Sequence, residues 1–220
     1  MKKIATLAAL VGVAAVMLAP VHASAESAEL RITGTIVPAA CTPAFAGGGV
    51  VDYGTISARS LNPVGQTMLP DKSIQLTVTC EAPGLFAVKV VDERAGTAIT
   101  SLTTIIGYDA NMKFGLGAAG GKNIGAYSME ITKATPDQGT TRQLVSLDGG
   151  ATWLVFAGGM TGDGGKLVAF ADNAGATVPG AHISITADIR VVTALDRTSN
   201  LPLTQKIPLD GLSTFELVYL

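Results

Sequence analysis

The chain has 220 residues, of which 48% are hydrophobic and 15% charged, and its formal net charge is −2. Lys2 and Lys3 lie in a segment that we interpret as a leader; without them 13 basic residues (15 minus 2) stand against 17 acidic ones, a net charge of −4. This balance argues against nucleic acid or an anionic membrane surface as a partner.

The first 25 residues have the pattern of a signal peptide. Lys2 and Lys3 provide the positive start, residues 4–18 form an apolar run, and Ala23-Ser24-Ala25 is a small-residue cleavage site. The run is too short to favour the alternative, an uncleaved anchor that spans the membrane. We therefore predict an exported chain, one domain over residues 26–220, and no membrane span after cleavage.

The remaining chain is predicted to be all-β. Short runs rich in Val, Ile and Thr alternate between apolar and polar residues and are separated by clusters of Gly, Asp, Asn and Pro, which is typical of a β-sandwich or barrel. The expected strands lie near residues 29–37, 50–56, 72–80, 85–92, 97–105, 124–132, 141–147, 152–157, 166–171, 181–193 and 213–219.

The only two cysteines, Cys41 and Cys80, both follow the leader. In the run KSIQLTVTC, Ile74, Leu76, Val78 and Cys80 share one face, so Cys80 points into the predicted core. An oxidising compartment favours a Cys41–Cys80 disulfide, with two free buried thiols as the alternative.

Two motifs in the glycine-rich middle indicate hairpins. Gly115, Gly117 and Gly120 satisfy the dinucleotide-binding spacing G-x-G-x-x-G, but no helix follows, so a flexible hairpin loop is expected. Residues 146–153, SLDGGATW, resemble the Asp-box turn of sialidase-type propellers. There Asp148 is expected to cap the turn and Trp153 to pack beneath it, with a carbohydrate contact by Trp153 as the alternative.

The run AHISITADIRVV predicts a strand whose Ile183, Ile185, Ala187 and Ile189 face inward and whose His182 faces solvent. His182 is the one histidine after the leader, so the chain offers no buried base for a Ser-His-Asp or Cys-His site. Asp163 and Asp172 lie in glycine-rich loops without the spacing of a calcium loop. We predict no catalytic residue, no cofactor and no metal site, hence no enzyme.

The chain ends in STFELVYL, where Phe215, Leu217 and Tyr219 alternate with Thr214, Glu216 and Val218. This is the period of a strand with one buried face. A strand at a chain end needs a partner strand to hold it, so we expect one beside it. Near the other end, Leu30, Ile32 and Ile36 share a face with Gly34 between them.

These ends resemble the pilin subunits of chaperone/usher fimbriae. Gly34, Ile36 and Cys41 match the first pilin element, Cys80 in LTVTC the second cysteine, and Phe215, Leu217 and penultimate Tyr219 the terminal strand. The run VDYGTI at 51–56 is also similar to the pilin strand after the first cysteine. More closely, DGLSTFELVYL and NIGAYSMEI resemble a GltF-like group of exported proteins, of unknown function and sometimes labelled beta-fimbriae subunits.

The resemblance implies an immunoglobulin-like (pilin-type) β-sandwich that lacks its final strand. It implies that Phe215, Leu217 and Tyr219 form the edge that binds a chaperone strand and then a donor strand, and that residues 26–36, with Leu30, Ile32, Gly34 and Ile36, form the donor. The chain would then be a structural subunit of a surface fimbria, with a periplasmic chaperone, an outer-membrane usher and neighbouring subunits as partners.

Two other functions stay open at this stage. The chain could supply its missing strand internally and act as an exported surface or tip protein for adhesion or ligand binding. An exported hydrolase is the third, disfavoured by the lack of catalytic groups.

Overall fold

The computed structural model describes residues 27–35, 40–103, 109–156 and 158–220. It contains two units, Met1–Ile36 and Val37–Leu220. In the first unit, residues 27–35 form no helix or strand, so the strand expected over 29–37 is not found there; residues 36 and 37 lie outside the described ranges. An extended segment becomes a strand only when another strand supplies its hydrogen-bond partners.

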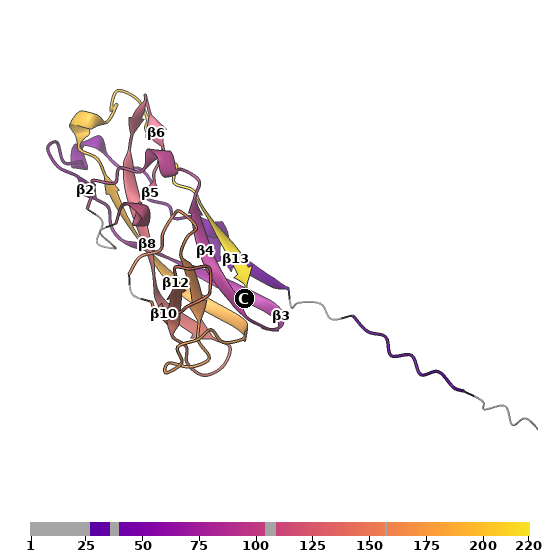
Figure 1. The fold of residues 1–220 in the computed structure, drawn as a ribbon. Helices are drawn as coiled ribbons and strands as arrows, with labels where there is room; N and C mark the ends of the chain where they lie inside the picture. The colour runs from indigo at the N-terminus through magenta and orange to yellow at the C-terminus, as the bar shows by residue number, and fades with distance from the viewer. Residues whose placement is uncertain (1–26, 36–39, 104–108, 157) are drawn as a thin grey trace, which may run out of the picture. The chain divides into compact units, whose positions relative to one another are not determined.

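The second unit is all-β, as predicted, and its strands form two main antiparallel sheets (Figure 1). The first has the order β1-β3-β12-β8-β5, with β2 beside β12: Cys41–Phe45, Lys72–Gly84, His182–Leu195, Gly125–Pro136, Phe114–Gly115 and, for β2, Thr67–Met68. The second has the order β10-β9-β11-β4-β13: Leu154–Val155, Gln143–Ser146, Leu167–Phe170, Phe86–Asp92 and Ser213–Tyr219.

A small hairpin of β6 (Ala118–Ala119) and β7 (Lys122–Asn123) stands apart from both sheets. Five short 3₁₀ helices lie between strands of the described ranges: Ala46–Gly49, Ala58–Ser60, Ala95–Thr97, Ala110–Met112 and Thr198–Asn200. No helix in these ranges is long and apolar enough to cross a membrane.

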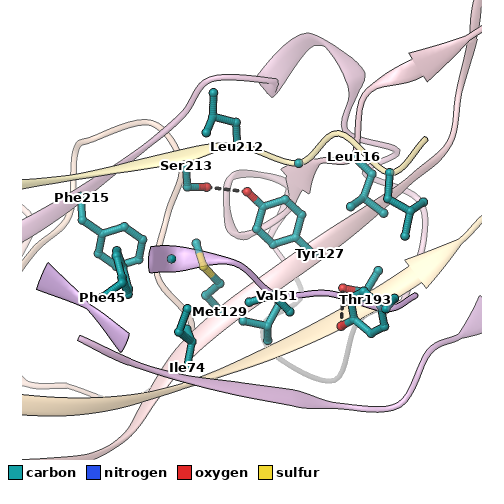
Figure 2. A pocket seen from close by; sticks show the side chains of 15 residues that line it. Phe45, Val51, Ile74, Leu116, Tyr127, Met129, Thr193, Leu212, Ser213 and Phe215 are labelled. Atoms are coloured by element: carbon teal, nitrogen blue, oxygen red, sulfur yellow. Dashed lines mark hydrogen bonds between the residues drawn. The ribbon is translucent and has the colours of Figure 1, made fainter. Parts of the chain in front are cut away.

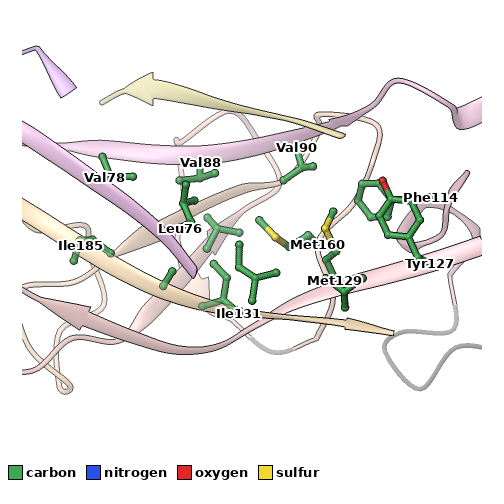
Figure 3. Close-up of a cluster of buried hydrophobic side chains, with 14 of the residues drawn as sticks. Leu76, Val78, Val88, Val90, Phe114, Tyr127, Met129, Ile131, Met160 and Ile185 are labelled. Carbon is green, nitrogen blue, oxygen red and sulfur yellow. The ribbon is translucent and has the colours of Figure 1, made fainter. Parts of the chain in front are cut away.

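The core lies between the two sheets, which makes the fold a β-sandwich. Figure 3 shows Leu76 and Val78 of β3 pointing toward Val88 and Val90 of β4. In β12, Ile185, Ala187 and Ile189 are almost fully buried, as the alternation predicts. The inward face of each strand therefore supplies one side of a shared apolar layer.

Two other expected strands are absent. Residues 50–56 run without a strand partner, and Gly54 has a positive φ of 62° with its N–H donated to the Asp52 carboxylate at 2.7 Å. Residues 97–103 begin in a 3₁₀ helix and continue through a turn in which the Leu102 N–H bonds the Ile99 carbonyl. Residues 104 and 105 lie outside the described ranges.

Candidate functional site: an open groove beside the C-terminal strand

An apolar groove runs along one flank of the sandwich. It consists of two hollows of about 190 Å³ and 850 Å³, and both are lined by Val51, Tyr53 and Leu209. One wall is formed by residues 45–61 and the other by residues 201–215. The inner faces of β3, β8 and β12 form the floor, with Ile74, Met129 and Thr193 among them (Figure 2). The groove thus opens onto the hydrophobic core.

Two hydrogen bonds join the groove walls to the floor and pair the hydroxyl groups there. Tyr53 donates its hydroxyl to Thr193 Oγ1 at 3.0 Å, and the hydroxyls of Tyr127 and Ser213 share a hydrogen bond of 2.5 Å. Burial raises the pKa of both tyrosines, more strongly for Tyr127, so both side chains stay neutral. This floor therefore favours apolar and uncharged side chains over charged ones.

Strand β13 is an edge strand whose free side faces this flank. In the described ranges it pairs with β4 alone, in an antiparallel register from Ser213–Asp92 to Tyr219–Phe86. The hydrogen bonds from Glu93 N–H to the Leu212 carbonyl and from Leu220 N–H to the Leu85 carbonyl fix which residues face β4. Because an antiparallel ladder alternates, the main-chain N–H and C=O groups of residues 213, 215, 217 and 219 point away from β4.

The predicted edge residues differ in their positions along β13. Phe215 lines the smaller hollow, and its ring meets the Phe45 ring edge-on at 5.0 Å between centroids. Leu217 is partly buried against the core. Tyr219 is 51% exposed, and its hydroxyl accepts the Cys41 N–H at 2.8 Å. Of the three, Phe215 alone lines either of the two hollows of the groove, which therefore lies beside the first part of β13 and the segment before it.

Gly211 allows the second wall to approach the floor closely. A β-carbon at this position would lie 2.9 Å from Cε1 of Tyr127, closer than side-chain atoms pack. Any larger residue would displace the Tyr127 ring or push the wall outward. The glycine therefore keeps Tyr127 in the groove floor.

The predicted donor residues lie in the N-terminal unit. Leu30 and Ile32 are each 89% exposed, and no heavy atom lies within 4 Å of the place of a β-carbon at Gly34. Ile36 lies outside the described residues. Two large apolar side chains this exposed on a short segment are costly in water and favourable to bury elsewhere.

The disulfide between Cys41 and Cys80 is present, as predicted. It joins β1 to β3, where the two residues are direct partners in the antiparallel register. Because β1 precedes the first wall of the groove, the bond fixes the start of that wall to the sheet.

The prediction that His182 faces solvent is wrong: the residue is 5% exposed. The register of β12 shifts between His182 and Ser184, which turns His182 inward and leaves Ile183 41% exposed. His182 Nε2 lies 3.3 Å from the Phe170 carbonyl, and Nδ1 lies 3.8 Å from the Asp137 carboxylate. A β-bulge reverses the alternation on which the prediction rested.

The Asp-box turn forms as predicted between β9 and β10. The Asp148 carboxylate accepts hydrogen bonds from the Ser146 hydroxyl at 2.6 Å and from the N–H and hydroxyl of Thr152 at 2.9 and 2.6 Å. These bonds lower the Asp148 pKa to about 2. Trp153 packs against the outer face of the second sheet, at Ala87, Leu167, Ala169 and Val218. Its ring therefore supports the fold.

The glycine motif at 115–120 also forms a hairpin, as predicted, with Gly120 and Gly121 at positive φ between β6 and β7. The Asp163 carboxylate accepts bonds from the Asn111 amide and the Gly165 N–H. Within the described ranges no three His, Cys, Asp or Glu side chains gather in a way that could hold a metal ion.

Sequence reasoning missed the wall formed by residues 201–215. Only Phe215 of this wall was identified, whereas Leu209, Gly211 and Ser213 also line the groove. The alternation of Ile207 and Leu209 in the run KIPLDGL was the available signal. It was too short to predict a strand, because Pro208 and Gly211 interrupt it.

One protein family and two known proteins are similar to parts of this chain. A family described as "Protein of unknown function (DUF1120)" matches residues 30–128. Protein GltF of Escherichia coli (strain K12) is 40% identical over 121 residues, which cover 48% of this chain and 48% of that protein. Uncharacterized protein YhcF of the same organism is 27% identical over 124 residues, which cover 49% and 51%.

The alignments thus span about half the length of these curated relatives. The family match includes β1, β3, β4 and the first groove wall, whereas the second wall and β13 lie beyond it. The predicted resemblance to GltF-like proteins is confirmed as a similarity over about half of the chain.

Proposed function

We propose that this chain is a structural subunit of a surface fimbria, assembled when the groove of one copy accepts the N-terminal segment of another. The observation that carries the proposal is the groove itself. It opens onto the core, and beside it β13 has an edge with no strand partner in the described ranges. An added strand would hydrogen-bond to this edge and cover the exposed core, which is the strand-addition mode of recognition.

The N-terminal segment has the chemistry that the groove favours. In residues 28–36 the side chains at 30, 32, 34 and 36 are apolar or absent, while Glu29 and Arg31 alternate with them. An extended strand would therefore present Leu30 and Ile32 to the apolar floor and both charges to water. Burying the three side chains Leu30, Ile32 and Ile36 at roughly 1.5 to 3 kcal/mol each contributes roughly 4.5 to 9 kcal/mol before the cost of ordering the segment.

The geometry also decides what kind of assembly would form. The donor segment and the acceptor groove are different surfaces, so each copy donates a strand with one surface and accepts a strand with the other. Such head-to-tail contacts form a ring only if the rotation between successive copies brings the last copy back to the first. Otherwise they produce an open filament. A domain with an uncovered core flank is also marginal alone, because total stabilities are about 5 to 15 kcal/mol. Export, a periplasmic chaperone and an outer-membrane usher belong to this proposal.

One observation favours a second function, a self-complemented exported domain that binds a ligand or another cell at its surface. The contacts Phe45–Phe215 and Cys41–Tyr219 bridge β1 and β13 with the domain's own side chains. Part of the flank is thus closed without a partner. If the remaining groove stayed empty, the chain would be a stable monomer.

The test compares variants of residues 26–220 by size-exclusion chromatography with light scattering. Leu30→Asp with Ile32→Asp places charges on the inward side of the donor, and Glu29→Ala with Arg31→Ala is the matched change on the outward side. We expect the wild type and the matched control to form chains of increasing length and the Asp variant to remain monomeric.

A synthetic peptide of residues 26–36 completes the experiment. It should bind the Asp variant one to one and raise its melting temperature, whereas the same peptide with both Asp substitutions should not. A wild-type chain that stays monomeric and ignores the peptide would favour the self-complemented domain.

A further inference from the structure

We propose that Cys41, Phe45, Phe215 and Tyr219 form a stop that ends the strand-accepting groove at Phe215. The inference rests on the proposed function and specifies its geometry: the incoming strand pairs with the first part of β13 and leaves the groove before Leu217. Nothing in the sequence pattern distinguishes these two parts of β13, since Phe215, Leu217 and Tyr219 alternate evenly.

The first step concerns the edge of β1 that faces β13. The Glu81 N–H bonds the Ala40 carbonyl, so residues 40, 42 and 44 face β3 and residues 41, 43 and 45 face away from it. On this outward side, Pro43 has no N–H to donate. The Cys41 N–H is already donated to Tyr219. Two of the three positions on the β1 edge therefore offer no free donor to a new strand.

The second step concerns the gap between β1 and β13. Cys41 contacts Tyr219, and Phe45 contacts Phe215. Moving four residues forward along β1 therefore matches moving four residues backward along β13. The two edges thus run antiparallel with side chains between them. Figure 2 shows the Phe45 and Phe215 rings side by side at the end of the hollow. A strand in this gap would have to displace both contacts.

The third step compares the space on the two sides of Phe215. Toward residue 201 the walls are lined by Val51, Leu209 and Gly211, and the space between them is hollow. Toward Tyr219, Leu217 packs against the core, and neither of the two hollows is lined by Leu217 or Tyr219. The boundary between the filled and the hollow part is the pair Phe45 and Phe215. The stop therefore fixes one end of any strand that enters.

The experiment measures hydrogen exchange by NMR at the amides of residues 213, 215, 217 and 219, all of which face away from β4. The protein is residues 26–220 with Leu30→Asp and Ile32→Asp, and the added strand is the synthetic peptide 26–36. We expect the peptide to slow exchange at Ser213 and Phe215 and to leave Leu217 and Tyr219 unchanged. The Cys41 amide should keep its protection.

Variants of the stop provide the second arm. Tyr219→Phe removes the acceptor of the Cys41 N–H and should speed exchange of that amide. Adding Phe45→Ala should let the peptide slow exchange at Leu217 as well. Thr132→Val is the control, because it deletes a hydroxyl that donates to the Asp188 carbonyl outside both the groove and the stop. It should leave the pattern at residues 213–219 unchanged.

The outcomes separate the two proposals. Slowed exchange at all four residues of β13 in the parent protein, or loss of Cys41 protection when the peptide binds, would overturn the stop and leave the strand-accepting function intact. A folded protein in which the peptide alters no amide in any variant would overturn both. If Phe45→Ala does not fold, Tyr219→Phe alone decides, since the stop requires its Cys41 amide to exchange faster.

Discussion

Strands β12 and β13 carry the same alternation of apolar and polar residues, yet their surroundings differ. β12 pairs with β3 and β8 along its two edges and with β2 near its end, so neither edge is available to another strand. β13 pairs with β4 on one edge and faces a hollow or bridging side chains on the other. Alternation predicts that one face of a strand is buried, whereas the topology decides which edge stays available. In this protein, the proposed function depends on that edge.

The largest expected effect comes from loss of the disulfide. Cys41→Ala with Cys80→Ala removes a link across 39 residues, and the chain-entropy model predicts a loss of about 4 kcal/mol in unfolding free energy. Because β1 carries the first groove wall, the loss should also weaken binding of the 26–36 peptide. Urea unfolding and peptide titration measure the two effects. Unchanged peptide affinity in a folded variant would show that the groove does not depend on the β1 anchor.

The contrast between the sheet interior and the open groove predicts a difference between two truncations. Ile189→Ala, at a fully buried position of β12, should cost about 2 to 5 kcal/mol with or without peptide. Val51→Ala, in the groove wall, should cost about 1 kcal/mol in the free domain. Its cost should rise in the peptide complex, where Val51 becomes covered. Equal costs for Val51→Ala in both states would contradict a peptide that occupies the groove.

A smaller effect is expected at the contact between the first wall and β12. Tyr53→Phe removes the hydroxyl that bonds Thr193, and the loss should be about 0.5 to 1.5 kcal/mol. Replacing both residues, with Thr193→Val as the second change, removes both polar groups and should cost less than the sum of the single changes. Thermal unfolding of the three variants measures this coupling. Strict additivity would mean that the hydrogen bond does not hold the wall.

The sequence predicts most strands of the sandwich because their periods are long and regular. β3, β4, β8, β12 and β13 all lie where alternating runs indicate them. The prediction of which residues face the core fails where a single extra residue shifts the alternation, as at the bulge that buries His182. The prediction of strands also fails at residues 97–103, where alternation comes from a turn whose Ile99 and Leu102 pack against Ala126 and Ala194.

The groove is harder to predict than the sheets for a physical reason. Residues 50–56 were expected to form a strand, and Val51, Tyr53 and Ile56 do pack against the core, but their main chain has no strand partner. Hydrophobic pattern reports side-chain burial and carries no information on whether the main chain is paired. Residues 201–212 form the opposite wall with even less periodicity. A groove between two unpaired segments therefore appears only when both are placed in space.

The smallest expected effect concerns the Asp-box hairpin, which supports β13 from outside the sandwich. A β-carbon at Gly150 would lie 3.7 Å from Leu220, and Trp153 packs with Val218. The Asp148 pKa of about 2 lies below the ordinary carboxylate value, so ionised Asp148 stabilises the turn above about pH 4 and this contribution is lost as the pH falls toward 2.

Asp148→Asn should therefore lower the melting temperature at pH 5, and the difference from wild type should shrink toward pH 2, where wild-type Asp148 becomes protonated. At pH 5 the variant should also speed amide exchange at Val218 and Leu220, which face β4 at the end of β13, while amides of β12 stay unchanged. A melting-temperature difference that is the same at both pH values would show that ionised Asp148 does not stabilise the turn. Equally faster amide exchange in β12 and β13 would show that the hairpin supports the whole sandwich. Support specific to β13 requires that exchange in β12, which belongs to the other sheet, stays unchanged.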